Sequence, residues 1–148
     1  MSFNMIFILA NKKKTTLLQI ARGLKQTDAK YRFESEEYFL YGSELLGQID
    51  IWRPEEKYFQ DWIQAARDRA RTRIATHEAQ VAEILRVFDR ATGILFFNVL
   101  WEDRERVETI ELYQPLWEWL FEHREGLLYV DSEGYWNVDE LLLPDKLS

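Results

Sequence analysis

The feature that most constrains the fold is an apolar run of eight residues, Ile94–Trp101, in which Asn98 is the one polar residue. Gly93 precedes the run, and the charged triplet Glu102-Asp103-Arg104 follows it. A continuous apolar run of this length, rich in aromatic and β-branched residues, is typical of a strand buried on both faces. A buried helical segment is the alternative, but the run is short and follows a glycine. We therefore predict a central strand near 94–101.

Three regions carry apolar residues at helical spacing: 17–24, 59–88 and 107–121. Thr15 or Thr16 can cap the first helix. Pro54 suits the first turn of the second region. The helical spacing of apolar residues in this region is interrupted at 75–77, which predicts two helices or one bent helix. Pro115 should kink the third helix or start a new one.

Alternation of apolar and polar residues predicts strands on both sides of the central run. The expected segments are 5–10, a hairpin at 31–42 that turns at Ser35-Glu36, 47–53, 127–130, 135–138 and a short edge at 141–143. Asp131-Ser132-Glu133-Gly134 has the residue preferences of a type I turn. No regular βαβ repeat is present. We therefore predict a single α+β domain over residues 1–148, with a mixed or mainly antiparallel sheet packed against three to four helices.

Composition limits the kinds of site and the cellular setting. The 148 residues suit one domain, and the absence of cysteine excludes disulfides, thiolate metal sites and cysteine nucleophiles. No apolar run approaches the roughly 18 residues of a membrane-spanning helix. The apolar stretch at 5–10 is followed, not preceded, by Lys12-Lys13-Lys14, so we expect a strand and a solvated basic loop and not a signal peptide. A cytoplasmic protein is expected.

The formal net charge of −7 is unevenly distributed along the chain. Residues 1–33 carry +6, whereas residues 101–148 carry −9. A strongly acidic segment repels nucleic-acid phosphates and attracts a basic partner. We therefore expect a protein partner, and neither a nucleic acid nor a membrane.

No familiar catalytic, cofactor or metal motif is present. The chain lacks a serine elbow, a zinc-binding helix motif, a dinucleotide fingerprint and a Walker loop. His77 and His123 have no neighbouring ligand set, and the carboxylates of 131–140 do not follow the calcium-loop spacing. We assign no catalytic residue, no metal site and no cofactor.

Four arginines, Arg67, Arg69, Arg71 and Arg73, gather in the second helical region. Helical spacing places the first and third on one face and the second and fourth on another. Surface pairing with Asp61, Asp68 and nearby acids is the expected role of these arginines.

The six tryptophans are too many to bury comfortably in one small core, and this surplus points to a binding surface. Trp117 fits the apolar stripe of its helix, whereas Trp119 falls off it, between two glutamates. Tryptophan is enriched at binding hot spots, although a helix buried on two sides would also explain Trp119. The expected partner-binding residues are Glu118, Trp119, Glu122, Asp131, Glu133 and Trp136.

Three segments, 47–51, 115–120 and 126–136, together resemble small acidic α+β bacterial proteins of the toxin-immunity kind. The resemblance implies a non-enzymatic inhibitor that neutralises a co-produced toxin by occluding its active site. It assigns no role to individual residues.

Two other functions stay open. One is an enzyme with a carboxylate-based or metal-assisted hydrolytic site, in which Asp50, Asp131 and Glu133 converge in a pocket. The other is a structural homo-oligomeric domain, such as a homodimer, in which the surplus aromatic residues form the self-interface.

Overall fold

The computed structural model describes residues 2–10, 14–101 and 104–145; Lys12 and Lys13 of the expected basic loop lie outside these ranges. Its strands form one sheet in the order β2-β3-β4-β5-β1-β6-β7-β8, and every pairing is antiparallel. Their bounds are β1 Ser2–Leu9, β2 Tyr31–Glu34, β3 Tyr38–Tyr41, β4 Glu44–Trp52, β5 Gly93–Leu100, β6 Gly126–Val130, β7 Gly134–Trp136 and β8 Leu141–Pro144. The predicted single α+β domain with a mainly antiparallel sheet is confirmed.

The apolar run forms β5, which lies near the sheet centre between β4 and β1, as predicted. Its side chains alternate between the two faces: Leu95 and Phe97 point to one apolar cluster and Ile94 to the other. All three are fully buried, which explains why the run needs almost no polar residue.

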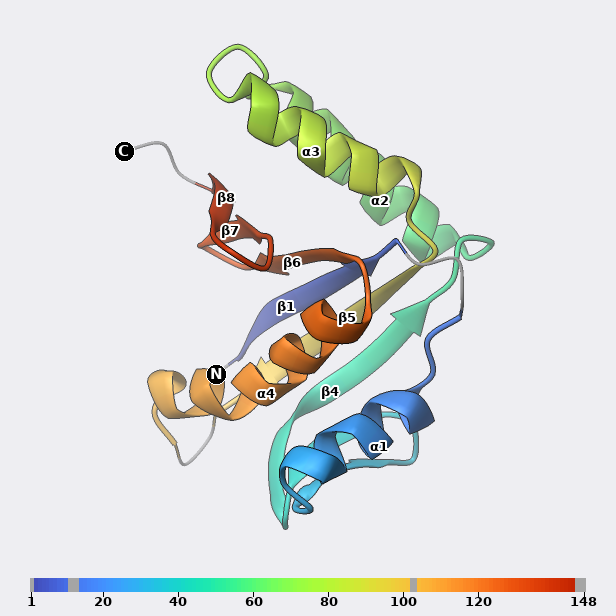
Figure 1. Cartoon of the computed structure of the whole chain (residues 1–148), viewed down its shortest axis with the longest axis vertical. Coiled ribbons are helices and arrows are strands. Elements are labelled where there is room, and N and C mark those ends of the chain that lie inside the picture. The colour runs from blue at the N-terminus through green and yellow to red at the C-terminus, as the bar shows by residue number, and fades with distance from the viewer. Residues whose placement is uncertain (1, 11–13, 102–103, 146–148) are drawn as a thin grey trace.

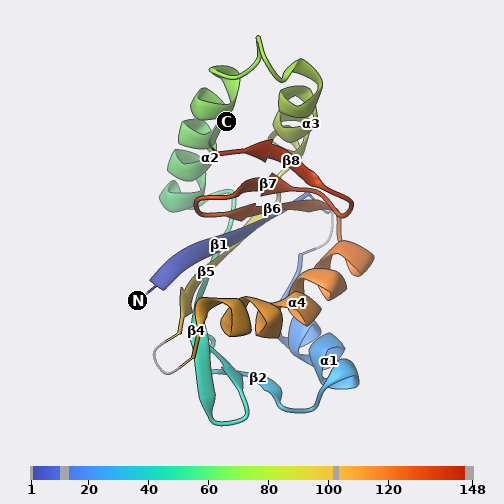
Figure 2. The same ribbon diagram turned by 90° about the vertical axis from the view of Figure 1, so that its left-hand side faces the viewer.

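Two pairs of helices cover the two faces of the sheet. Helices α1 (Leu17–Thr27) and α4 (Arg106–His123) pack on one face, and α2 (Lys57–Arg71) and α3 (Glu78–Asp89) pack on the other. Figures 1 and 2 show the α2–α3 pair at the end of the sheet that holds β6, β7 and β8. No helix of the described ranges has the length and apolar character needed to cross a membrane.

The helix boundaries largely follow the sequence signals. Thr16 caps α1 with a complete capping box, since its hydroxyl accepts from the backbone of Gln19 and the Gln19 side chain accepts in return. The interruption of the helical spacing at 75–77 separates α2 from α3, as predicted. Pro54, however, lies in a turn before α2, which begins at Lys57. Pro115 starts no new helix, because α4 continues through it.

Two hairpin turns place residues in the left-handed region. The β2–β3 hairpin turns at Ser35 and Glu36, as predicted, and both have φ of +56°. The expected type I turn at 131–134 is wrong, because Ser132 has φ of +71°. The Glu133 N–H instead donates to the Val130 carbonyl at 3.0 Å, so the turn begins one residue earlier.

Candidate functional site

A groove of about 680 Å³ lies between α4 and the turns that connect β6, β7 and β8. We call it the α4 groove. One wall comes from α4, the floor comes from β1 and β6, and the opposite wall comes from residues 133 and 136–140. Segments far apart in the sequence therefore build one concave surface.

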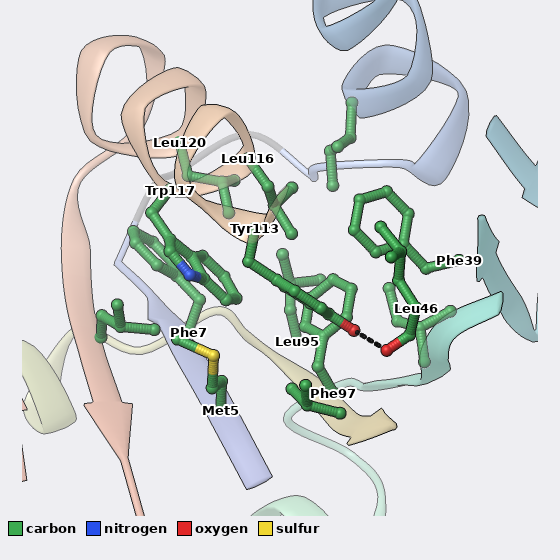
Figure 3. Close-up of a cluster of buried hydrophobic side chains, with 14 of the residues drawn as sticks. Met5, Phe7, Phe39, Leu46, Leu95, Phe97, Tyr113, Leu116, Trp117 and Leu120 are labelled. Atoms are coloured by element: carbon green, nitrogen blue, oxygen red, sulfur yellow. Dashed lines mark hydrogen bonds between the residues drawn. The ribbon is translucent and has the colours of Figure 1, made fainter. Parts of the chain in front are cut away.

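The α4 wall is fixed by the residues that anchor this helix to the sheet. Tyr113, Leu116, Trp117 and Leu120 are buried beneath it, and the Tyr113 hydroxyl donates to the Leu46 carbonyl at 2.9 Å (Figure 3). With this face against the sheet, Glu118 and Glu122 stay exposed, one helical turn apart, along the groove. The anchoring residues thus aim two carboxylates at the same opening.

The floor of the groove is apolar. Met5 of β1 lies opposite Val130 of β6 in the sheet register, and both point to the α4 side with Leu128. Trp117 and Phe121 extend this floor from the helix. The indole Nε1–H of Trp117 is buried, and no acceptor for it exists among the described residues. Burial of this donor without a partner is a cost that the packing of α4 on the sheet must offset.

The opposite wall is a loop held by its own side chain. The Asn137 Oδ1 accepts the backbone N–H groups of Asp139 and Glu140, each at 2.8 Å. This turn presents Val138 with 68% of its surface exposed. Trp136 lies on the sheet side of the same wall, packed against the α4-side cluster.

Five carboxylates line the groove: Glu118, Glu122, Glu133, Asp139 and Glu140. Among the described lining residues there is no lysine or arginine, and the ion pairs found in the described ranges involve none of the five acids. An apolar floor with a rim of one charge sign produces a negative potential directly above the binding surface. Such a surface suits an apolar anchor flanked by cationic side chains.

Four of the six expected partner-binding residues line this groove: Glu118, Glu122, Glu133 and Trp136. Trp119 and Asp131 do not. Asp131 extends the pairing of β1 with β6, because its backbone N–H donates to the Asn4 carbonyl and its carboxylate accepts the Asn4 N–H, at 3.1 and 3.0 Å. Its position is explained by the sheet alone.

Trp119 is half-buried where α4 packs against α1. Its ring stacks on His123 with centroids 4.8 Å apart, and the Arg124 guanidinium lies 5.1 Å from its centre. The helix is thus covered on two sides, by the sheet and by α1. The sequence predicted Trp119 and Glu133 as parts of one partner-binding surface, but only Glu133 lines the α4 groove.

Sequence reasoning missed Val138 as a lining residue and assigned Asp139 and Glu140 only a weak metal possibility. The missed signal was the Asn137 side chain, whose two hydrogen bonds fold residues 137–140 into a turn that faces α4.

The three acids of the enzymatic alternative are not brought to one pocket. Asp50 lines a separate hollow of about 400 Å³ with Glu36 and Glu37, whereas Glu133 lines the α4 groove. Within the described ranges, no three His or carboxylate side chains are arranged to hold a metal ion.

Comparison with protein-family models, with curated proteins and with solved structures finds no match to this chain.

Proposed function

We propose that this chain is a non-enzymatic inhibitor that binds a basic segment of a partner protein in the α4 groove. The observation that carries the proposal is the combination of an apolar floor with five unpaired rim carboxylates and no lining lysine or arginine among the described residues. A hydrophobic centre inside a polar rim is the usual anatomy of a protein–protein interface.

The two parts of the groove have different tasks. Phe121 and Trp136, both partly exposed, offer aromatic surface, and residues of this kind supply most of the affinity at protein interfaces. The rim carboxylates act mainly on the rate of encounter and on the choice of partner, because exposed charges steer a basic protein toward the groove.

The finer form of the proposal is an immunity protein whose partner is a bacterial toxin. Toxins that bind or cleave nucleic acids present basic active-site surfaces, and an acidic groove complements such a surface. In this role the chain would cover the active site and leave the toxin folded but inactive. The resemblance of 47–51, 115–120 and 126–136 to immunity proteins supports the same class.

The test compares three proteins as bait in the source cell. These are the unaltered chain, a groove variant Glu118→Lys/Glu122→Lys, and a control Glu55→Lys/Asp61→Lys. All four substituted residues are exposed and the change in charge is the same, but the control pair lies in and before α2, outside the groove. The proposal expects one basic protein to be captured by the unaltered chain and by the control and to be lost from the groove variant.

The captured protein is then expressed alone and together with each bait. Growth arrest that is relieved by the unaltered chain and the control, but not by the groove variant, supports an immunity function. Capture that is equal for all three baits would refute the groove as the binding site. A captured protein without toxicity would refute the immunity form and leave the inhibitor form to be tested on that protein's own activity.

Self-association is a distinct outcome, because residues 1–33 of a second copy carry +6. Light scattering on the purified chain measures this directly. A stable dimer that the groove variant abolishes would assign the groove to the homodimer and not to a foreign partner.

A further inference from the structure

A second concave site lies on the opposite face of the sheet, where the end of α2 meets β6, β7 and β8. It has a volume of about 220 Å³, and its charged lining residues are Arg69, Arg73 and Asp145. Thr72, Tyr129 and Tyr135 complete its polar lining. We call it the arginine hollow.

The backbone of Arg73 is held firmly in the turn between α2 and α3. Its carbonyl accepts the backbone N–H groups of Thr76 and His77, at 3.2 and 2.9 Å. Its Nη1 donates to the Pro144 carbonyl of β8, which fixes one end of the guanidinium. The side chain is therefore pre-positioned and has little freedom left to lose on binding.

The other edge of the same guanidinium is unsatisfied. Nε and Nη2 of Arg73 are both buried, and neither donates to any described residue. These two N–H groups lie side by side and point in one direction, so they match two oxygens of an oxyanion. A buried cationic donor pair without an acceptor is costly, because the lost hydration is not replaced.

The neighbouring groups show what the hollow can accept. The Arg69 guanidinium lies beside the Tyr135 hydroxyl and counteracts the rise in the pKa of Tyr135 that burial causes. The Tyr129 hydroxyl donates to the Asp145 carboxylate at 2.9 Å. Among the described lining residues two cations thus face one anion, which leaves an excess of positive charge.

The other two arginines of the cluster behave as the sequence predicted and provide a contrast. Arg67 pairs with Asp89, and Arg71 lies 4.0 Å from the Asp68 carboxylate. Arg69 and Arg73, on the other face, form none of the ion pairs found in the described ranges. The expected surface pairing of all four arginines is therefore wrong for this second face.

We propose that the arginine hollow binds a tetrahedral oxyanion, either free phosphate or a phosphate monoester. Two of its oxygens take the Nε–Nη2 edge of Arg73, and Arg69 supplies the second positive charge. Bound phosphate would tie the end of α2 to the β7–β8 hairpin, because Arg73 already contacts Pro144. The site shares no lining residue with the α4 groove and does not depend on the function proposed for it.

The test measures binding of sodium phosphate and of O-phosphoserine at constant ionic strength, by ³¹P line broadening and by thermal unfolding. At a phosphate concentration tenfold above its Kd, the unfolding temperature should rise by roughly 4 °C. Stronger binding of O-phosphoserine would identify an ester as the ligand, and equal or weaker binding would identify free phosphate. No broadening and no thermal shift with either compound would overturn the proposal.

Three variants separate recognition from structural loss. Arg73→Lys keeps the charge but lacks the two-pronged edge, and should weaken phosphate binding by about tenfold or more. Arg71→Gln removes a positive charge from an arginine outside the hollow and should leave binding unchanged. Asp145→Asn removes the one lining anion and should strengthen binding.

The competing explanation is that Asp145 itself neutralises Arg73 in solution. In that case phosphate would not raise the unfolding temperature of the unaltered chain, and Asp145→Asn would lower that temperature. That result, or equal phosphate affinity in Arg73→Lys and Arg71→Gln, would overturn the proposed site.

Discussion

Gly23 of α1 and Trp119 of α4 are packed so closely that a Cβ on Gly23 would lie 1.9 Å from the Trp119 Nε1. Alanine is normally favoured over glycine within a helix by about 0.5–1 kcal/mol. Here we expect Gly23→Ala to reduce the free energy of unfolding by about 1–3 kcal/mol, because Trp119 or α1 must move. Urea unfolding measures the change.

The matched experiment removes the obstacle. In a Trp119→Ala background, Gly23→Ala should stabilise the chain or leave it unchanged, since the clash is gone. A similar loss in both backgrounds would show that the contact between the two helices is not the cause.

Tyr113→Phe tests the bond that fixes α4 above the sheet. The substitution keeps the buried ring but leaves the Leu46 carbonyl without its donor, so we expect a loss of about 1–2 kcal/mol in unfolding free energy. Tyr58→Phe is the control, because Tyr58 is 69% exposed. Equal effects of the two substitutions on urea unfolding would contradict the assigned role of the Tyr113 hydroxyl.

Glu36→Gly should stabilise the protein by about 0.5–1 kcal/mol. Glu36 has φ of +56°, a conformation that costs an L residue roughly 1–2 kcal/mol and costs glycine little. Glu37→Gly, at the next residue, lacks this strain and should destabilise the hairpin. Thermal unfolding of both variants is the measurement, and the opposite ranking would argue against strain at Glu36.

Stability should fall as the pH rises above about 10. Burial, with smaller effects of Tyr41 and Asp28, raises the pKa of Tyr31 to about 12, and burial is also the main cause of the raised pKa values of Tyr113, Tyr129 and Tyr135. An unfolded tyrosine titrates near 10, so between pH 10 and 12 the unfolded chain releases protons that the folded chain retains.

The tyrosine contribution is therefore complete below pH 10 and is lost above it. Urea unfolding at pH 8, 10 and 11 measures the loss, which should be smaller in Tyr113→Phe than in the unaltered chain. An identical pH dependence in both proteins would exclude Tyr113 as a contributor.

Val138→Ser should weaken binding of the partner recovered in the pull-down by about tenfold, since it removes an exposed apolar contact from the groove wall. Val107→Ser is the control, because Val107 is also exposed, at 62%, but lies outside the groove. Surface plasmon resonance gives both affinities.

Raising the salt from 50 to 500 mM should slow association by about tenfold or more through screening of the rim carboxylates.

Local periodicity predicted the order of helices and strands, because the number of buried faces of an element determines the spacing of its apolar residues. The Ile94–Trp101 run needed no other information to be placed at the centre of the sheet. The turn at 131–134 was mispredicted because Ser132, which is neither Gly nor Asn, adopts a positive φ. Side-chain preferences alone do not reveal such a conformation.

The candidate site was predictable only in part. Glu118, Glu122, Glu133 and Trp136 were predicted as one acidic, aromatic surface, and they line one groove. The surroundings of Trp119 depend on α1, which lies almost a hundred residues earlier, and the decisive residue there is a glycine with no side chain to detect. The arginine hollow was hidden for a similar reason, because Arg73 meets β8 some seventy residues later.

The position of β1 between β5 and β6 has a consequence for the newly made chain. β1 leaves the ribosome well before its two neighbours, which begin at Gly93 and Gly126. Until then Met5–Leu9 is an apolar segment with both edges unpaired, which favours aggregation. The pairing of β1 with strands so distant in the sequence also requires long loops to close, which slows folding. A chaperone that shields this segment during synthesis would therefore have its largest effect before residue 130 is made.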